Sequence, residues 1–491
     1  MKKSEQMLFS RMDIAKIIAP LILQGILSIA IGMIDSMMVS NKGTEAFAGV
    51  SLVGALDTLL ITLFSALTSG GAVVLAQAVG RGDQKRACDA AKQLWYATTA
   101  AATAIAVVVL VLRRPLLQLL FGAVEEGVMQ NALAYFSFIA LSFPFLAIEN
   151  SVSATFRAQG DSMISLKISI FMNLLNIGGN ALLIYGLDMG AAGAAIATLV
   201  SRIVGAVLMT VIAHGKKRYI YLERLFHYRP DFAIIKDILR IGVPNGVENS
   251  MFQFGRLLTQ SLVSALPTAA ITANAAALSL ANLQYTTGGA IQSTMVAVVG
   301  RCIGAKERKQ AKHYARSLLG IGYGSLFVVI TLMTVFSSPL LMLYGLPGEE
   351  SALAQQLLLY HGIVSIFIWP IAFCLPNAFR AANDVRFSMI VSTLSMWVFR
   401  VALGYVLALP SVTLFGVLTI PCANMGVMGV WVAMTIDWLF RTILFLVRFI
   451  TDKWLSKYDA KIRAEEAAAL KEEAVIAETA AQPAMKEEAN P

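Results

Sequence analysis

Apolar residues along the chain form long runs that short polar segments interrupt, up to about residue 450. A helix needs about 20 apolar residues to cross a bilayer. The runs predict six spans near residues 14–40, 48–79, 89–113, 128–158, 162–186 and 189–214, and six more near 237–265, 269–300, 311–335, 353–380, 385–409 and 425–450. Because they do not alternate in polarity as barrel strands do, we expect an all-α integral membrane protein with twelve transmembrane helices.

Composition and charge agree with a membrane protein. The chain is 57% hydrophobic and 14% charged, whereas soluble domains carry about 25% charged residues. Its net charge of +9 does not indicate nucleic acid, because the basic residues lie in short loops between spans. Alternate loops hold Arg81, Lys85, Arg86 and Lys92, then Lys216, Lys217, Arg218, Arg224 and Arg229, then Arg301, Lys306, Arg308, Lys309 and Lys312. This positive-inside pattern predicts a multi-pass protein of the cell (inner or plasma) membrane with both termini cytoplasmic.

Several motifs occur twice, 218 to 236 residues apart. Pro20 returns as Pro244, and the repeated motifs are Ser69-Gly-Gly-Ala72 with Thr287-Gly-Gly-Ala290, Phe156-Arg-Ala158 with Phe379-Arg-Ala381, and Met189-Gly190 with Met425-Gly426. Six helices per copy predict two lobes related by a pseudo-two-fold axis along the membrane normal. The predicted parts are a lobe at 1–213, a cytoplasmic loop at 214–236, a second lobe at 237–450 and a charged cytoplasmic tail at 451–491.

Nucleotide and metalloprotease motifs do not occur in the sequence. Without a Gly-x-x-x-x-Gly-Lys-Ser/Thr loop, an ion gradient is the expected energy source, and without His-Glu-x-x-His a membrane metalloenzyme is disfavoured. We therefore expect a transporter, not an enzyme, with no cofactor and with sodium or a proton as the coupling ion. Small-molecule substrates and membrane lipids are its expected partners, with no nucleic acid and no obligate protein partner.

Ionisable residues at membrane depth are the main functional candidates, since each costs about 2.5–3.5 kcal/mol to insert. Asp437 and Arg441 are four residues apart and are predicted to pair on one helix face. Arg202 is predicted to extend toward the cytoplasm. The remaining members of this set are Asp35, Asp57, Glu149, Glu248, Arg256 and Arg400.

Asp35 has no basic residue within a turn or two, and it lies roughly 7–8 Å from the outer end of the first span at 1.5 Å per residue. Asn180 is expected at a similar depth in the fifth span, with Asn176 one turn further in and Thr198 at a comparable depth in the sixth. One carboxylate, two amides and one hydroxyl would offer oxygen ligands for sodium, or a protonatable site. The alternative is a polar network that only joins the helices.

Several motifs together resemble the multidrug and toxic compound extrusion (MATE) family, over residues 10–450. They are Pro20 followed by Met33-Ile-Asp-Ser-Met-Met-Val39, Gln77-Ala-Val-Gly-Arg-Gly-Asp83, Phe156-Arg-Ala-Gln-Gly-Asp161, Asn176 to Gly186, and Met189 to Arg202. The resemblance implies twelve helices in two lobes. It also implies export of drugs and organic, often cationic, molecules driven by entry of sodium or protons.

Residue by residue, the resemblance assigns Asp35 to the family's coupling carboxylate and Pro20 to a proline at which the first helix bends. Asn176 matches an asparagine ligand and Thr198 a hydroxyl of the sixth helix. Asn180 stands where some members have aspartate and others asparagine, which leaves the choice between sodium and proton open.

The second lobe departs from the family pattern. Some members have acids around Phe252 and near Trp369, and this sequence has neither. Glu248, one turn before Phe252, either substitutes for the missing acid or pairs with Arg256. Asp57 and Glu149 are further candidates for the site.

A related flippase for lipid-linked sugars is the alternative function, because it would share the two-lobed architecture. Its cleft should be lined by cationic residues that bind a pyrophosphate. Arg256 and Arg400 favour that alternative, but the intramembrane charges are mixed in sign. Multidrug efflux is therefore the predicted function.

Overall fold

The computed structural model describes residues 7–122, 124–223, 225, 227, 229–342, 348–414, 418–456, 458–460 and 462–463. The first half contains α1 (Arg11–Ser40), α2 (Thr44–Gly80), α3 (Gln84–Phe121), α4 (Glu126–Ala158), α5 (Ser162–Asn180), the π-helix η1 (Ala181–Gly186) and α6 (Gly190–Ala213).

The second half begins with α7 (Phe232–Ser264), α8 (Thr268–Gln284), α9 (Thr286–Gly304), α10 (Arg308–Val335) and α11 (Ser337–Met342). It continues with α12 (Gly348–Trp369), η2 (Pro370–Cys374), α13 (Leu375–Ala381), α14 (Val385–Ser395), η3 (Met396–Ala402), α15 (Leu403–Ala408) and α16 (Gly426–Ile450). Strands β1 (Ser411–Leu414) and β2 (Leu418–Pro421) form an antiparallel hairpin with Ser411 opposite Pro421, and the short helix η4 (Lys453–Leu455) follows α16.

The predicted helical fold is confirmed, and each predicted span falls on helical residues. The largest difference at a helix end is in α3, which continues to Phe121, and the hairpin β1–β2 was not predicted. Ten helices in the described part of the chain are long and apolar enough to cross a membrane. The predicted spans at 237–265 and 269–300 are not among these ten. The first corresponds to α7, which carries several charged residues. The second is divided at Tyr285 into the shorter helices α8 and α9.

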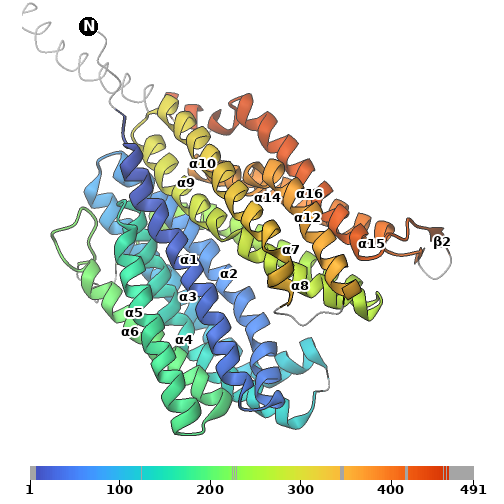
Figure 1. The fold of residues 1–491 in the computed structure, drawn as a ribbon. Helices are drawn as coiled ribbons and strands as arrows, with labels where there is room; N and C mark the ends of the chain where they lie inside the picture. The colour runs from blue at the N-terminus through green and yellow to red at the C-terminus, as the bar shows by residue number, and fades with distance from the viewer. Residues whose placement is uncertain are drawn as a thin grey trace, which may run out of the picture.

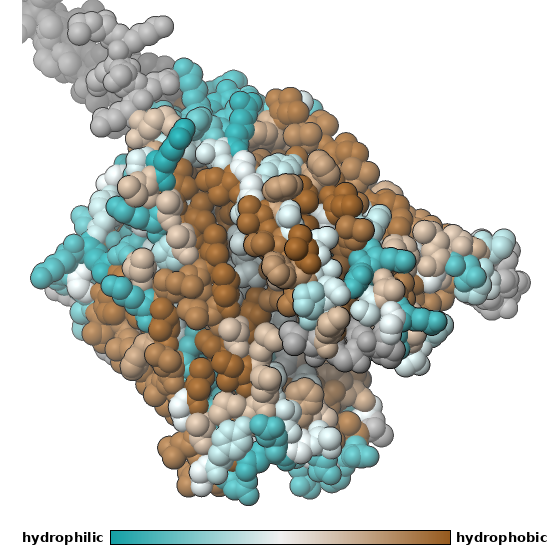
Figure 2. Space-filling view, in the orientation of Figure 1, coloured by the Kyte–Doolittle hydropathy of each residue, from teal (hydrophilic) through white to brown (hydrophobic). Residues whose placement is uncertain are grey.

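Helices α1 to α6 gather on one side of the molecule and the later helices on the other (Figure 1). The two groups meet where α2 packs against α7 and α9, and where α1 packs against α9. Apolar side chains cover the middle of the face shown in Figure 2, and hydrophilic side chains gather toward its ends. This distribution is the one expected of a protein whose helices cross a bilayer.

Glycines bring the two groups of helices into backbone contact near Arg81 and Arg301, which we call the basic end. A Cβ atom at Gly80 would lie 2.1 Å from the carbonyl oxygen of Arg301, and one at Gly304 would lie 2.1 Å from that of Gln77. The Gln77 side chain also donates a hydrogen bond to the Ala381 carbonyl at 2.8 Å. The repeated Gly-Arg motifs therefore close the two halves against each other at this end.

The segment after α16 packs against the second half. Trp454 and Leu455 are fully buried, and the Trp454 ring stacks on Phe449 with centroids 5.6 Å apart. Asp459 forms an ion pair with Arg308 at 3.5 Å. The beginning of the predicted tail thus belongs to the folded core, and residues 464–491 lie outside the described residues.

Candidate functional site

Asp35, Asn176, Asn180 and Thr198 lie together where α1, α5 and α6 pack. Asn180 Nδ2 donates to Asp35 Oδ1 at 2.7 Å and to Asn176 Oδ1 at 3.3 Å. Asn176 Nδ2 donates to Thr198 Oγ1 at 3.2 Å, and the Thr198 hydroxyl donates to the Ala194 carbonyl at 3.0 Å. Both asparagines are buried. The structure therefore brings the four predicted coupling residues together.

The Asn176 amide fits this site in two orientations. In the orientation just described, its oxygen faces the Asp35 carboxylate. After a half-turn, its nitrogen donates to Asp35 Oδ1 at 3.0 Å and Oδ2 at 3.3 Å, and its oxygen accepts from Thr198 at 3.2 Å. The second orientation gives both ends of the amide suitable partners, so the Asn176 nitrogen is assigned as a donor to Asp35. The buried Oδ1 of Asn180 has no hydrogen-bond partner among the described residues, so a further oxygen is free for a hard cation such as sodium.

The other intramembrane acids of the first half are Asp57 and Glu149. Asp57 forms an ion pair with Arg202 at 3.5 Å, and Arg202 also donates to Ser142 at 2.6 Å. The prediction that Arg202 extends toward the cytoplasm is wrong, because α2 offers it a carboxylate within the helix bundle. Within the described chain, neither Asp35 nor Glu149 has a basic side chain within ion-pairing distance.

Pro20 lies inside α1, and the helix continues through it. Just beyond it, α1 borders a central cavity of about 480 Å³ that α2, α4, α7, α9 and α13 also line. The lining is rich in polar side chains, including Gln24, Asn150, Arg157 and Arg380. A proline removes one helical hydrogen bond, so α1 has a local weak point at the start of the stretch that borders this cavity and, further along, carries Asp35.

Glu248 pairs with Arg380, not with Arg256. Arg380 Nη2 donates to Glu248 Oε2 at 2.8 Å, and Arg380 Nη1 donates to Asn377 Oδ1 at 2.9 Å. Both ion-pair partners are buried. The predicted alternative with Arg256 is wrong because α13 brings Arg380 closer. Arg380 lies in the repeated Phe-Arg-Ala motif, and this repeat was the sequence signal that could have marked it as a functional candidate.

Asp437 and Arg441 form the predicted pair, with Arg441 Nε and Nη2 donating to the carboxylate at 2.8 and 3.1 Å. Ser395 also donates to Asp437. Arg400 Nε lies 3.8 Å from the same carboxylate, and all three charged side chains are buried. Two arginines therefore share one aspartate in this part of the second half.

Comparison with known proteins agrees with this geometry. The sequence model of the MatE family matches residues 20–182 and again 244–406. This chain belongs to the MatE family. It is 26% identical to the uncharacterized transporter YisQ of Bacillus subtilis (strain 168) over 447 residues, which cover 89% of this chain and 94% of YisQ. It is 24% identical to a probable multidrug resistance protein NorM of Thermotoga maritima over 456 residues, which cover 90% of this chain and 93% of that protein.

Solved structures share the fold. An outward-facing multidrug resistance MATE transporter of the MOP superfamily aligns with a TM-score of 0.81 at 18% identity, covering 91% of this chain and 96% of that one. A MOP superfamily transporter from Pyrococcus furiosus, described as having a binding pocket of reverse polarity, aligns with a TM-score of 0.79 at 17% identity and the same coverage. MatE proteins are transporters, so the chain is placed in a transporter family and the predicted resemblance is confirmed.

The two MatE matches also align the halves of this chain. The two matched ranges begin 224 residues apart and also end 224 residues apart. With this offset, Asp35 corresponds to Thr259 and Asn176 to Arg400. The Met189-Gly190 and Met425-Gly426 motifs place Met434 opposite Thr198. Thr259, Arg400 and Met434 all line one pocket of about 320 Å³, which is thus the second-half counterpart of the Asp35 site.

Proposed function

We propose that this chain is a secondary active exporter that moves organic small molecules out of the cell in exchange for sodium or protons. Asp35 is the coupling carboxylate in this proposal. The observation that carries it is a carboxylate at membrane depth that neutral amides and a hydroxyl surround, with no cationic side chain in ion-pairing reach among the described residues. An unpaired charge at this depth is costly, so it marks an ion pathway by default.

Ion binding changes the charge of this site in one step. A proton or sodium neutralises Asp35. Release of the ion restores the carboxylate, which the amide nitrogens of Asn176 and Asn180 then stabilise by hydrogen bonds. Because α1 also borders the central cavity through Gln24, a bend at Pro20 would link the state of Asp35 to the shape of the substrate cavity.

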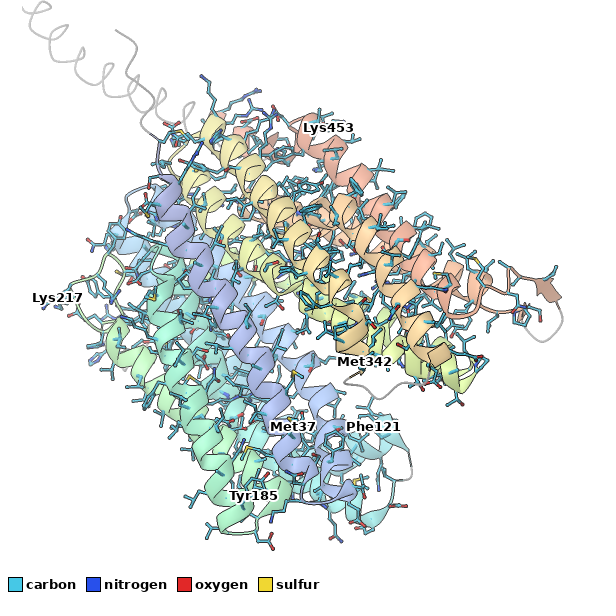
Figure 3. All side chains as sticks on the ribbon, viewed as in Figure 1. Met37, Phe121, Tyr185, Lys217, Met342 and Lys453 are labelled. Carbon is cyan, nitrogen blue, oxygen red and sulfur yellow. The ribbon has the colours of Figure 1, made fainter. Side chains whose placement is uncertain are left out.

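The proposed membrane architecture has twelve spans in two lobes, related by a pseudo-two-fold axis along the membrane normal. Helix α7 and the pair α8–α9 supply the two spans beyond the ten apolar ones, since α7 and α9 pack against α2 between the other helices. The basic end faces the cytoplasm, as the distribution of basic loops predicts. Figure 3 labels Lys217 and Lys453 along one edge of the molecule, and Met37, Tyr185 and Met342 toward the opposite side. With its halves in contact at the basic end, the structure corresponds to a state closed toward the cytoplasm.

Reporter fusions test this orientation. Fusions at Pro491 and at Leu346 should report opposite sides of the membrane, because an odd number of proposed spans separates the two positions. Identical sidedness would overturn the twelve-span topology and leave the fold itself unaffected.

Flux measurements test the proposed exchange. Purified protein in proteoliposomes should export organic dyes under an imposed sodium or proton gradient, and the two gradients applied separately identify the coupling ion. Asp35→Asn keeps the shape of the side chain but removes its charge, so gradient-driven export should fall at least about a hundredfold. Insertion and folding should stay near normal. Asp188→Asn makes the same chemical change in an exposed ion pair with Lys42 and should retain export within about twofold.

Full export by Asp35→Asn under the same gradient would contradict this mechanism. The coupling role would then pass to Glu149, the other intramembrane candidate acid of the first half without an ion pair in the described chain. The flippase alternative is less favoured, because Glu248 neutralises Arg380 and leaves Arg157 as a single arginine without a carboxylate partner in the described lining of the central cavity. The named relatives include multidrug resistance proteins.

A further inference from the structure

We infer that the second-half pocket binds the anionic group of an exported organic acid. This inference rests on the proposed function and names a class of its substrates. The pocket is lined by Thr58 of α2, by Gln253, Arg256 and Thr259 of α7, and by Arg400 of η3, and it includes further apolar residues of α7, α8 and α16.

The charge of the pocket is positive. Its lining contains two arginines, and no carboxylate among the described residues. Arg256 has no carboxylate within 4 Å in the described chain. Arg400 lies 3.8 Å from Asp437, but Arg441 already donates two shorter hydrogen bonds to that carboxylate. Arg400 and Arg441 therefore share one aspartate, and Arg256 has no carboxylate partner in the described chain. A buried cation such as Arg400 without a full partner is costly.

An anion from outside the chain would supply the missing partner. Arg400 is buried and held over the rings of Phe252 and Trp438, with its guanidinium carbon 5.2 and 5.6 Å from their centroids. Arg256 is accessible to solvent, so a ligand can reach it. Guanidinium groups bind carboxylates and phosphates with charge-assisted hydrogen bonds, and the amide of the neighbouring Gln253 adds a neutral donor.

The repeat shows that the second half has changed the chemistry of a shared position. The first half places a carboxylate at Asp35, whereas the corresponding residue is the hydroxyl of Thr259. Close to the position of the Asn176 amide, the second half has the guanidinium of Arg400. A cation site and an anion site thus occupy equivalent places in the two halves.

The remaining lining favours an organic ligand. Leu257, Trp431 and Met434 form apolar walls, and the Trp431 indole is fixed by a hydrogen bond to Asn274 Oδ1 at 2.8 Å. Aromatic and apolar walls around a few polar groups are typical of small-molecule sites. The pocket therefore fits a carboxylate joined to an aromatic or aliphatic body of modest size.

Equilibrium binding to the full-length protein in detergent, without any gradient, tests this inference. The probes are 2-naphthoate and 2-naphthylmethylammonium, which share a ring system and differ in charge. We expect 2-naphthoate to bind more tightly and Arg256→Gln to weaken it about tenfold or more, the loss expected for one charge-assisted hydrogen bond. Arg256→Lys should retain most of the affinity because it keeps the charge. Arg113→Gln, which removes an exposed arginine that donates to Ser137, is the matched control and should bind normally.

Export of 2-naphthoate from proteoliposomes should fall in Arg256→Gln and persist in Arg256→Lys. The inference is overturned if the naphthylmethylammonium binds better, or if Arg256→Gln leaves naphthoate binding unchanged. It is also overturned if Arg113→Gln weakens naphthoate binding as much as Arg256→Gln does, since net charge alone would then explain the effect. Asp35→Asn should bind naphthoate normally, so failure of the coupling mechanism and failure of this anion site give different results.

Discussion

The Asp35 site and its second-half counterpart occupy corresponding positions but carry opposite charges. In the first half, neutral side chains of α5 surround Asp35, and Asn180 donates to it at 2.7 Å. In the second half, the acids Glu248 and Asp437 are each held by arginine, while Arg256 and Arg400 face a pocket without a carboxylate among its described lining residues. The two halves therefore differ in the charge at corresponding positions, as the two proposed sites require.

This contrast separates acids that can change their charge from acids that hold the fold together. A carboxylate in a buried pair with arginine has a full partner, and removing either member leaves an isolated charge. A carboxylate among amides and hydroxyls can take up a proton or a cation without breaking an ion pair. Asp35 is of the second kind and Glu248 of the first, although both were candidates from the sequence.

Glu248→Gln should therefore give the largest loss of stability among the changes considered in this comparison. It leaves Arg380 buried without its carboxylate, which costs about 3–5 kcal/mol. Folding yield and thermal stability in detergent should drop clearly, while the turnover of the surviving protein stays close to normal. The double variant Glu248→Gln/Arg380→Gln should recover part of the lost stability. Normal stability with lost turnover would instead make Glu248 a second coupling acid.

Asn180→Leu tests the first half. It removes the Asn180 Oδ1 that is offered to sodium, so the affinity for sodium should fall by about 1.5–3 kcal/mol, as for other contacts to a charged group. The sodium concentration for half-maximal export should then rise roughly tenfold or more. If the coupling ion is a proton, the half-maximal concentration should fall instead, because the lost N–H donor stabilised the ionised Asp35. Asn173→Leu is the matched control on the same helix, since the described hydrogen bond of Asn173 is a weak one to Ser169 at 3.4 Å. Equal effects of the two variants would indicate a general change in α5.

Gly80→Ala should disturb the contact that closes the basic end. The new methyl group would meet the Arg301 carbonyl at 2.1 Å, and such overpacking costs about 1–3 kcal/mol. Because only the closed contact is strained, the protein should spend more time open toward the basic end. A thiol reagent applied from that side should label Ser69→Cys in the central cavity faster in a Cys422→Ser background. Gly289→Ala, whose methyl group would meet no atom within 4 Å, should leave the labelling rate unchanged.

The helices and the Asp35 cluster were predictable because hydrophobic runs and depth along a helix are local properties of a sequence. Asn176 and Asn180 are one turn apart, so their shared face followed from the helical period. The partner of Glu248 was not predictable in this way. Arg256 is close in sequence, whereas Arg380 comes from a helix 132 residues away, and only tertiary packing decides between them. Arg202 and Asp57 present the same problem across α6 and α2.

The chain end illustrates the same limit. Composition after residue 451 indicated a charged cytoplasmic tail, yet Trp454 is fully buried against Phe449. Composition is an average over many residues, so a single aromatic side chain that packs into the core, such as Trp454, hardly changes the composition of the tail. The boundary between core and tail therefore falls later than the change in composition.

Removal of residues 457–491 should have the smallest effect. The cut leaves Trp454 and Leu455 in the core. It removes the half-buried Tyr458 at the edge of the core and one described surface ion pair, between Arg308 and Asp459. Such a surface pair contributes about 0–1 kcal/mol, so export by the shortened protein should stay within about twofold of the full chain. Trp454→Ala is the contrasting change, because emptying a buried tryptophan site costs about 3–5 kcal/mol. If the shortened protein reaches the membrane in normal amounts but loses flux, residues 457–491 take part in the transport cycle. The function of residues 457–491 would then differ from that of the Asp35 site and from that of its second-half counterpart.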